Sequence, residues 1–254
     1  MIVCSECKTI MLESDKFCAS CGASKTLAID KKDKRSIRLV IAFYGSMLLL
    51  LLLSYFVYLN TTGGLITEIT LGLVFIGITL GFSLVDLRNI LPLYSLRNID
   101  AKALLIAILF PLLTAVIVWY GIGALNMYLY DDNSSILAEY AYYDHPFLWS
   151  FIFISLVAPI FEELAFRGFL FNQLRAVSSV RITIIATAFI FALIHLSLFS
   201  LLWIFPFGMA LGYLRHKYRT LWLGMIVHFI HNTAILVMDY YQYYDRFPLV
   251  HYFN

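Results

Sequence analysis

Seven apolar stretches, each close to the length of a membrane-spanning helix, dominate this chain of 254 residues. Hydrophobic residues make up 61% of the chain and charged residues 13%, and that charged share is roughly half that of an ordinary soluble domain. A helix needs about 20 predominantly apolar residues to cross the hydrocarbon core of a bilayer. The sequence therefore predicts an all-α polytopic membrane protein with about seven transmembrane helices, at 37–59, 65–87, 102–122, 147–171, 182–197, 199–214 and 220–238.

Lysine and arginine are distributed unevenly between the segments that join these stretches. With seven spans, the N-terminus and the loops 88–101, 172–181 and 215–219 lie on one side and hold most of the cations, whereas the other side keeps only Arg246. Short cytoplasmic segments carry the excess of Lys and Arg in membrane proteins. We therefore expect a multi-pass protein of the cell membrane with a cytoplasmic N-terminus and an external C-terminus.

All four cysteines fall within the first 21 residues, as Cys4-x2-Cys7 and Cys18-x2-Cys21. Two such pairs can place four thiolates around one ion, and four ligands leave no open position for catalysis, so the site is predicted to hold structural Zn²⁺. Two disulfides are the alternative, which a reducing cytoplasm disfavours. The segment resembles the short zinc ribbons at the N-termini of many bacterial membrane proteins. The predicted domains are a ribbon at 1–23, a charged linker at 24–36 and a transmembrane domain at 37–254.

The fourth apolar stretch ends in a charged cluster. Glu162, Glu163 and Arg167 lie where a bare charge at bilayer depth would cost several kcal/mol, so the cluster is predicted to be functional. Glu163 and Arg167 are four residues apart, on one helical face, which suits an ion pair. Glu162 points about 100° away from Glu163 and is left free for chemistry.

Two further polar clusters lie in later stretches: Phe191-x3-His195 in the fifth, and His228-x3-Asn232, which includes His231, in the seventh. A single histidine in an apolar helix is more often a structural hydrogen-bonding residue. The three clusters are predicted to lie at depths in the membrane that allow them to meet. At about 1.5 Å per residue, Glu162, His195 and His228 each lie roughly 13 to 21 Å along their own span from a predicted cytoplasmic arginine.

A carboxylate, imidazoles and an amide in one membrane cavity suit hydrolysis by water. Glu162 would take the proton from the water, and His195 would orient that water. His228 and Asn232 would donate hydrogen bonds to the oxyanion. His231 is rotated about 60° from His228 and could also face inward.

The three motifs, in this order on successive spans, resemble the signature of the CPBP family, the CAAX-prenyl proteases and bacteriocin-processing enzymes. The similarity covers roughly residues 100–238. It implies an α-helical intramembrane glutamic endopeptidase that needs no catalytic cofactor, with Glu162 as general base and His195 as its partner. It also implies an oxyanion site at His228 and Asn232 and supporting positions at Glu163 and Arg167, and it assigns no role to His231.

Other functions fit the same residues. The carboxylate and two histidines could ligate zinc in a metalloprotease, although the chain has no HExxH pair. A non-enzymatic scaffold or bacteriocin self-immunity protein would keep the cluster for helix packing. A transporter would use Glu162 as a proton site, but no internal repeat is evident. The expected partners are the lipid bilayer, a membrane-associated or C-terminal peptide substrate, and a protein bound by the ribbon, with no nucleic acid; the expected source is bacterial.

Overall fold

The computed structural model describes residues 2–4, 7–12, 18–21, 31–61, 63–130, 135–196 and 198–246. The chain divides into two compact units, Met1–Arg35 and Ser36–Asn254. In the first unit, strand β1 (Ile2–Val3) pairs antiparallel with β2 (Ile10–Met11). The connection between the strands carries Cys4 and Cys7, and Lys8 takes a left-handed φ of 62° in the turn.

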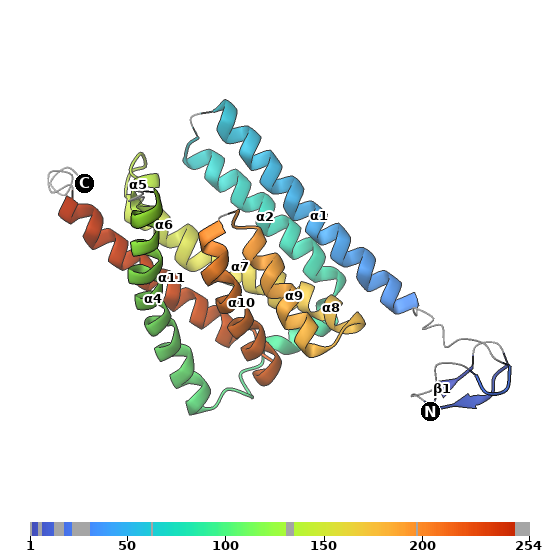
Figure 1. The fold of residues 1–254 in the computed structure, drawn as a ribbon. Helices are drawn as coiled ribbons and strands as arrows, with labels where there is room; N and C mark the ends of the chain where they lie inside the picture. The colour runs from blue at the N-terminus through green and yellow to red at the C-terminus, as the bar shows by residue number, and fades with distance from the viewer. Residues whose placement is uncertain are drawn as a thin grey trace. The chain divides into compact units, whose positions relative to one another are not determined.

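The second unit is built from helices (Figure 1). Helix α1 begins at Lys31, so the last part of the predicted linker is helical. The helices are α1 (Lys31–Asn60), α2 (Leu65–Val85), α3 (Leu87–Ile90), the 3₁₀ helix η1 (Leu91–Tyr94), α4 (Ala101–Tyr130), α5 (Ile136–Glu139), α6 (Pro146–Ser150), η2 (Phe151–Val157), α7 (Ala158–Glu162), η3 (Glu163–Leu170), α8 (Phe171–Val177), α9 (Val180–Leu193), α10 (Leu198–Tyr218) and α11 (Trp222–Arg246).

The predicted all-α membrane architecture is confirmed, but the count of seven spans is not. In the described part of the chain, five helical segments are long and apolar enough to cross a bilayer: Lys34–Asn60, Leu65–Val85, Ala101–Leu125, Pro146–Val177 and Trp222–Asp245. The predicted fifth span is the 14-residue helix α9, which is shorter than a typical span, and the predicted sixth is α10. Helices α9 and α10 pack against each other, and α11 packs against α4 and η2.

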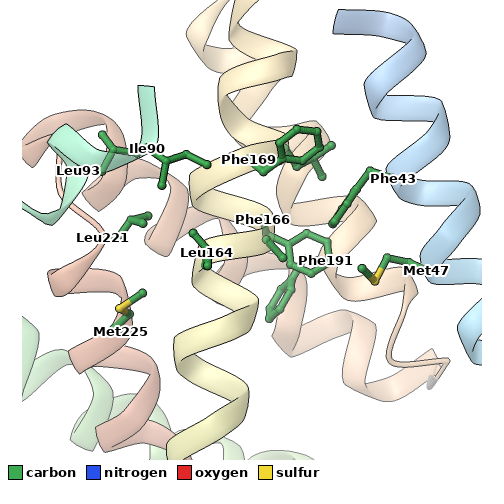
Figure 2. Packing of buried hydrophobic residues seen from close by; sticks show 12 residues of the cluster. Phe43, Met47, Ile90, Leu93, Leu164, Phe166, Phe169, Phe191, Leu221 and Met225 are labelled. Carbon is green, nitrogen blue, oxygen red and sulfur yellow. The ribbon is translucent and has the colours of Figure 1, made fainter. Parts of the chain in front are cut away.

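Segment Pro146–Val177 is one continuous helical rod with two π-helical parts, η2 and η3. All eight residues of η3 are buried. Figure 2 shows Phe166 and Phe169 of η3 packed among Phe43 and Met47 of α1 and Phe191 of α9. The Phe166 and Phe191 rings meet edge to face with centroids 5.1 Å apart, a favourable aromatic geometry. This packing fixes the segment that bears Glu163 and Arg167.

Candidate active site

One cavity collects the polar residues predicted from three separate spans. It has a volume of about 510 Å³, and its lining includes Glu162 of α7, His195 after α9, and His228, His231 and Asn232 of α11. Apolar and aromatic side chains of α4, α5, η2, α9 and α10 form the rest of its wall. A mostly apolar cavity with a few convergent polar groups is typical of a ligand site.

A second cavity of about 300 Å³ shares Glu162 and His195 with the first. Its remaining walls come mainly from α1 and α2, with Ile194 beside His195. Glu162 and His195 therefore lie where two cavities meet, and both can be reached from either one.

Pro159 explains how Asn232 is held. In η2 the Ala158 N–H bonds the Phe153 carbonyl, five residues earlier, as π-helical geometry requires. Pro159 has no N–H, so the next carbonyl in that register, Ile154, lacks its helical donor. Asn232 Nδ2 donates to the Ile154 oxygen at 2.9 Å. This bond uses one of the two amide hydrogens and leaves the other available for a ligand.

His195 lies on the turn that follows α9, because that helix ends at Leu193. Its Nδ1 lies 2.8 Å from the Phe191 carbonyl oxygen. A carbonyl only accepts, so Nδ1 carries the hydrogen, and Nε2 of the neutral ring is an acceptor. The next residue, Leu196, takes a left-handed φ of 50°, which turns the chain away after His195. His195 can therefore accept a hydrogen bond from water through Nε2.

The His228 ring lies between the two adjacent glutamates. Its Nε2 is 3.8 Å from Glu162 Oε2, and its Nδ1 is 3.6 Å from Glu163 Oε1. The side chain of Glu162 keeps 17% of its surface exposed, whereas that of Glu163 keeps 1%. Glu162 is thus the carboxylate open to the cavity, and Glu163 lies behind the imidazole.

Glu163 and Arg167 form a buried ion pair, as their spacing predicts. Arg167 Nη1 lies 3.0 Å from Glu163 Oε1, and both side chains are almost fully buried. Arg167 Nη2 donates to the Gly208 carbonyl at 3.2 Å, and its guanidinium carbon lies 4.2 Å from the centre of the Phe191 ring. Neither charged residue of the pair lines the cavity. They support the site from behind.

Gly224 lies directly against Glu163, although none of the sequence motifs includes it. A Cβ atom placed there would clash with Glu163 Oε2 and lie 3.2 Å from Glu163 Cδ. No real Cβ is found that close to another heavy atom, so any side chain at 224 would displace the carboxylate. Gly208 is similarly tight, with Arg167 Nη2 3.2 Å from its hypothetical Cβ. Both glycines lie inside predicted spans, and a glycine in a helix can indicate a close approach of another group.

The sequence places Arg215 in the predicted cytoplasmic loop 215–219, but in the structure it lies on α10 with 9% of its surface exposed. Its Nε donates to the Arg167 carbonyl at 3.0 Å, and its Nη2 donates to Asn172 Oδ1 at 2.9 Å. Asn172 in turn donates to Asp86 at 2.9 Å. Arg215 therefore ties α10 to η3 and is weak evidence for membrane orientation.

The four cysteines gather at one point in the N-terminal unit. Their sulfurs lie within 4.8 Å of one another, with Cys4 and Cys21 3.7 Å apart and Cys7 and Cys18 3.5 Å apart. Four sulfurs about 2.3 Å from a tetrahedral ion are spaced by roughly 3.8 Å, so the cluster fits a metal. Hydrogen bonding with Thr9 lowers the pKa of Cys7 to about 6, which favours a thiolate ligand.

In the part of the chain that the structure describes, these cysteines are the one group of three or more Cys, His, Asp or Glu side chains gathered closely enough to hold a metal ion. Glu162, His195 and His228 line the same cavity but are not gathered in that way. Their arrangement suits a carboxylate with hydrogen-bonding imidazoles.

Comparison with known proteins covers this same region. Residues 144–234 match the family described as type II CAAX prenyl endopeptidase Rce1-like, a narrower range than the motifs predicted. The "Putative membrane peptidase YdiL" of Bacillus subtilis (strain 168) is 27% identical over 34% of this chain and 35% of its own length. The "UPF0177 protein YaiH" of Lactococcus lactis subsp. lactis (strain IL1403) is 24% identical over 63% of this chain and 66% of its own length.

The matched region thus spans less than two thirds of either relative. No solved structure is significantly similar to the chain. The family match contains all seven residues of the three motifs, from Glu162 to Asn232. Residues 144–234 are therefore similar to the Rce1-like, type II CAAX prenyl endopeptidase family, in agreement with the resemblance that the order of the motifs indicated.

Proposed function

We propose that this protein is an intramembrane endopeptidase of the glutamic type, which hydrolyses membrane-associated or C-terminal peptides. The observation that carries the proposal is the cavity lined together by Glu162, His195, His228 and Asn232 within a strongly apolar helical unit. An intramembrane ionisable residue in such a cavity is by default a functional residue. The Rce1-like match supports the peptidase class.

Each residue has a role that its geometry supports. Glu162 takes a proton from a water molecule, and His195 Nε2 accepts that water's second hydrogen. The water then attacks the peptide carbonyl. His228 Nε2 and the free Asn232 amide hydrogen stabilise the oxyanion, and Glu162 returns the proton to the leaving amine. The Glu163–Arg167 pair keeps the supporting side of His228 fixed.

The direct test uses two peptides and the purified full-length protein in lipid vesicles. One peptide ends in a farnesylated cysteine followed by three residues, and the other is the same peptide without the farnesyl group. Mass spectrometry should find cleavage of at least one peptide, and the ratio of the two rates reports whether a lipid chain is required. A wild-type protein that cleaves neither peptide would contradict the proposal.

We propose zinc as the metal of the cysteine cluster, with a structural role only. The purified chain should then contain one zinc ion, and the double change Cys4→Ser and Cys7→Ser should remove it while peptide cleavage continues, because the cluster and the cavity lie in different compact units. Metal analysis beside the cleavage assay measures both. Two zinc ions per chain, one of them lost in His195→Ala, would support a metalloprotease instead.

We propose a bacterial cell membrane as the location, with a cytoplasmic N-terminus and an external C-terminus. Five spans and seven spans are both odd numbers, so either count places the termini on opposite sides of the membrane. Single cysteines at Ser24, Asn133 and Asn254, which lie outside the described residues, test this in a cysteine-free background. An impermeant thiol reagent should label intact cells at 133 and 254 but not at 24. Labelling at position 24 would show that the N-terminus is external and that the proposed orientation is wrong.

A further inference from the structure

His231 lines the cavity beside Asn232, yet the mechanism above gives it no task. Its Nδ1 lies 3.2 Å from Thr114 Oγ1 of α4. The same hydroxyl donates to the Pro111 carbonyl at 3.0 Å. A threonine hydroxyl has one hydrogen and two lone pairs, so Thr114 has no second hydrogen for His231. Thr114 must therefore accept from His231, and Nδ1 of that ring carries the hydrogen.

This bond determines what His231 can offer to the cavity. In a neutral imidazole, one nitrogen donates and the other accepts. With Nδ1 donating to Thr114, Nε2 is left as an acceptor, and the Pro111 carbonyl is a further hydrogen-bond partner of the ring. The residue is 5% exposed and lines the cavity. The site thus contains an acceptor whose tautomer is fixed by the hydrogen bond at Nδ1.

Aromatic packing holds the ring in place. The His231 ring stacks on Trp203 with centroids 5.3 Å apart and an interplanar angle of 29°, and it lies 4.7 Å from the Phe207 ring. Both aromatic residues also line the cavity. A ring clamped on its face and bonded at Nδ1 cannot turn freely to present Nδ1 instead. The acceptor at Nε2 is therefore preorganised.

We infer that His231 Nε2 binds a backbone N–H of the peptide substrate, next to the carbonyl held by His228 and Asn232, and that Thr114 is the positioning residue that fixes its tautomer. The inference rests on the proposed peptidase function. A peptide offers alternating carbonyl acceptors and N–H donors. Neighbouring residues of α11 would bind both: His228 and Asn232 would donate to a carbonyl, and His231 would accept from an N–H. Since this contact exists before and during the reaction, its loss should raise KM more than it lowers kcat.

The experiment follows cleavage of the farnesylated peptide in vesicles and compares His231→Ala and Thr114→Val with wild type. Both variants should raise KM by about 5 to 10-fold with kcat within about twofold, since one hydrogen bond is worth roughly that factor. Thr114→Ser should restore the wild-type KM because it keeps the hydroxyl. Thr187→Val is the matched control, as Thr187 is a buried threonine that bonds a carbonyl of its own helix at 2.8 Å and lines neither cavity.

A second set of peptides identifies the contact directly. Each peptide has one backbone N–H, other than that of the scissile bond, replaced by an ester oxygen. One replacement should raise KM in the wild type and have no further effect in His231→Ala. Additive losses at every position would overturn the inference while leaving the peptidase function intact. If the wild type cleaves no peptide, binding of the labelled peptide to Glu162→Gln decides the matter. The Glu162→Gln, His231→Ala double variant should then bind the peptide more weakly than Glu162→Gln does. Equal binding to the two proteins, or no binding to either, overturns the inference.

Discussion

Glu162→Gln is expected to lower kcat for peptide hydrolysis by a factor of about 10² to 10⁴, the usual contribution of a general base. Glutamine keeps the size and hydrogen-bonding shape of the side chain but cannot take a proton from water. The change removes no buried charge pair, because the buried partner of Arg167 is Glu163. KM, helix content and thermal stability should therefore stay close to those of the wild type, which steady-state kinetics and circular dichroism can measure.

The matched control is Glu68→Gln, which also neutralises a carboxylate within a membrane-spanning helix. Glu68 lies on α2, pairs with Tyr58 and lines neither of the two cavities at Glu162. It should retain most of the wild-type turnover. Near-normal turnover in purified Glu162→Gln protein would contradict the proposed mechanism, even though the sequence resembles that of a peptidase family.

Arg167→Ala is expected to lower the free energy of unfolding by about 3–5 kcal/mol, the usual cost of removing one partner of a buried ion pair. The change leaves the Glu163 carboxylate buried without its cation, 3.6 Å from His228. It also removes the donor to the Gly208 carbonyl and the contact with the Phe191 ring. Activity should fall as well, because the support behind His228 is lost. Thermal unfolding in detergent measures the first effect, and peptide cleavage measures the second.

Two further variants separate the charge pair from simple loss of packing. The double change Glu163→Gln and Arg167→Met removes both charges and keeps much of the volume, so it should recover part of the stability that Arg167→Ala loses. Arg181→Ala removes an exposed arginine of α9 and should leave stability nearly unchanged. An Arg167→Ala protein as stable as the wild type would mean that the pair is hydrated.

The polar residues that meet at the cavity could be named from the sequence because side-chain chemistry and helical spacing are local. Glu163 and Arg167 are four residues apart and do pair, and Glu162 is the more open carboxylate. The supporting contacts could not be derived in this way, since each depends on how separate helices approach. Gly224 admits the Glu163 carboxylate against α11, and Thr114 meets His231 across 117 positions of sequence. No local pattern encodes either distance.

The fold was predictable in class but not in detail. Within the described residues, apolar length identifies five of the seven predicted spans, and the 14-residue helix α9 is shorter than a typical span. The π-helical segments were also unexpected. Pro159 indicates an irregular helix, but the sequence does not show whether the helix kinks or widens into a π-helix. That outcome depends on neighbouring groups, here on Asn232, which bonds the Ile154 carbonyl.

The two cavities that meet at Glu162 and His195 have a consequence for what happens after a bond is broken. A peptide lying across both residues would place one part in the chamber beside α1 and α2 and the other in the chamber beside α10 and α11. Once cut, the two fragments would lie in separate cavities. Neither would have to pass the other, so departure of one product need not wait for departure of its partner.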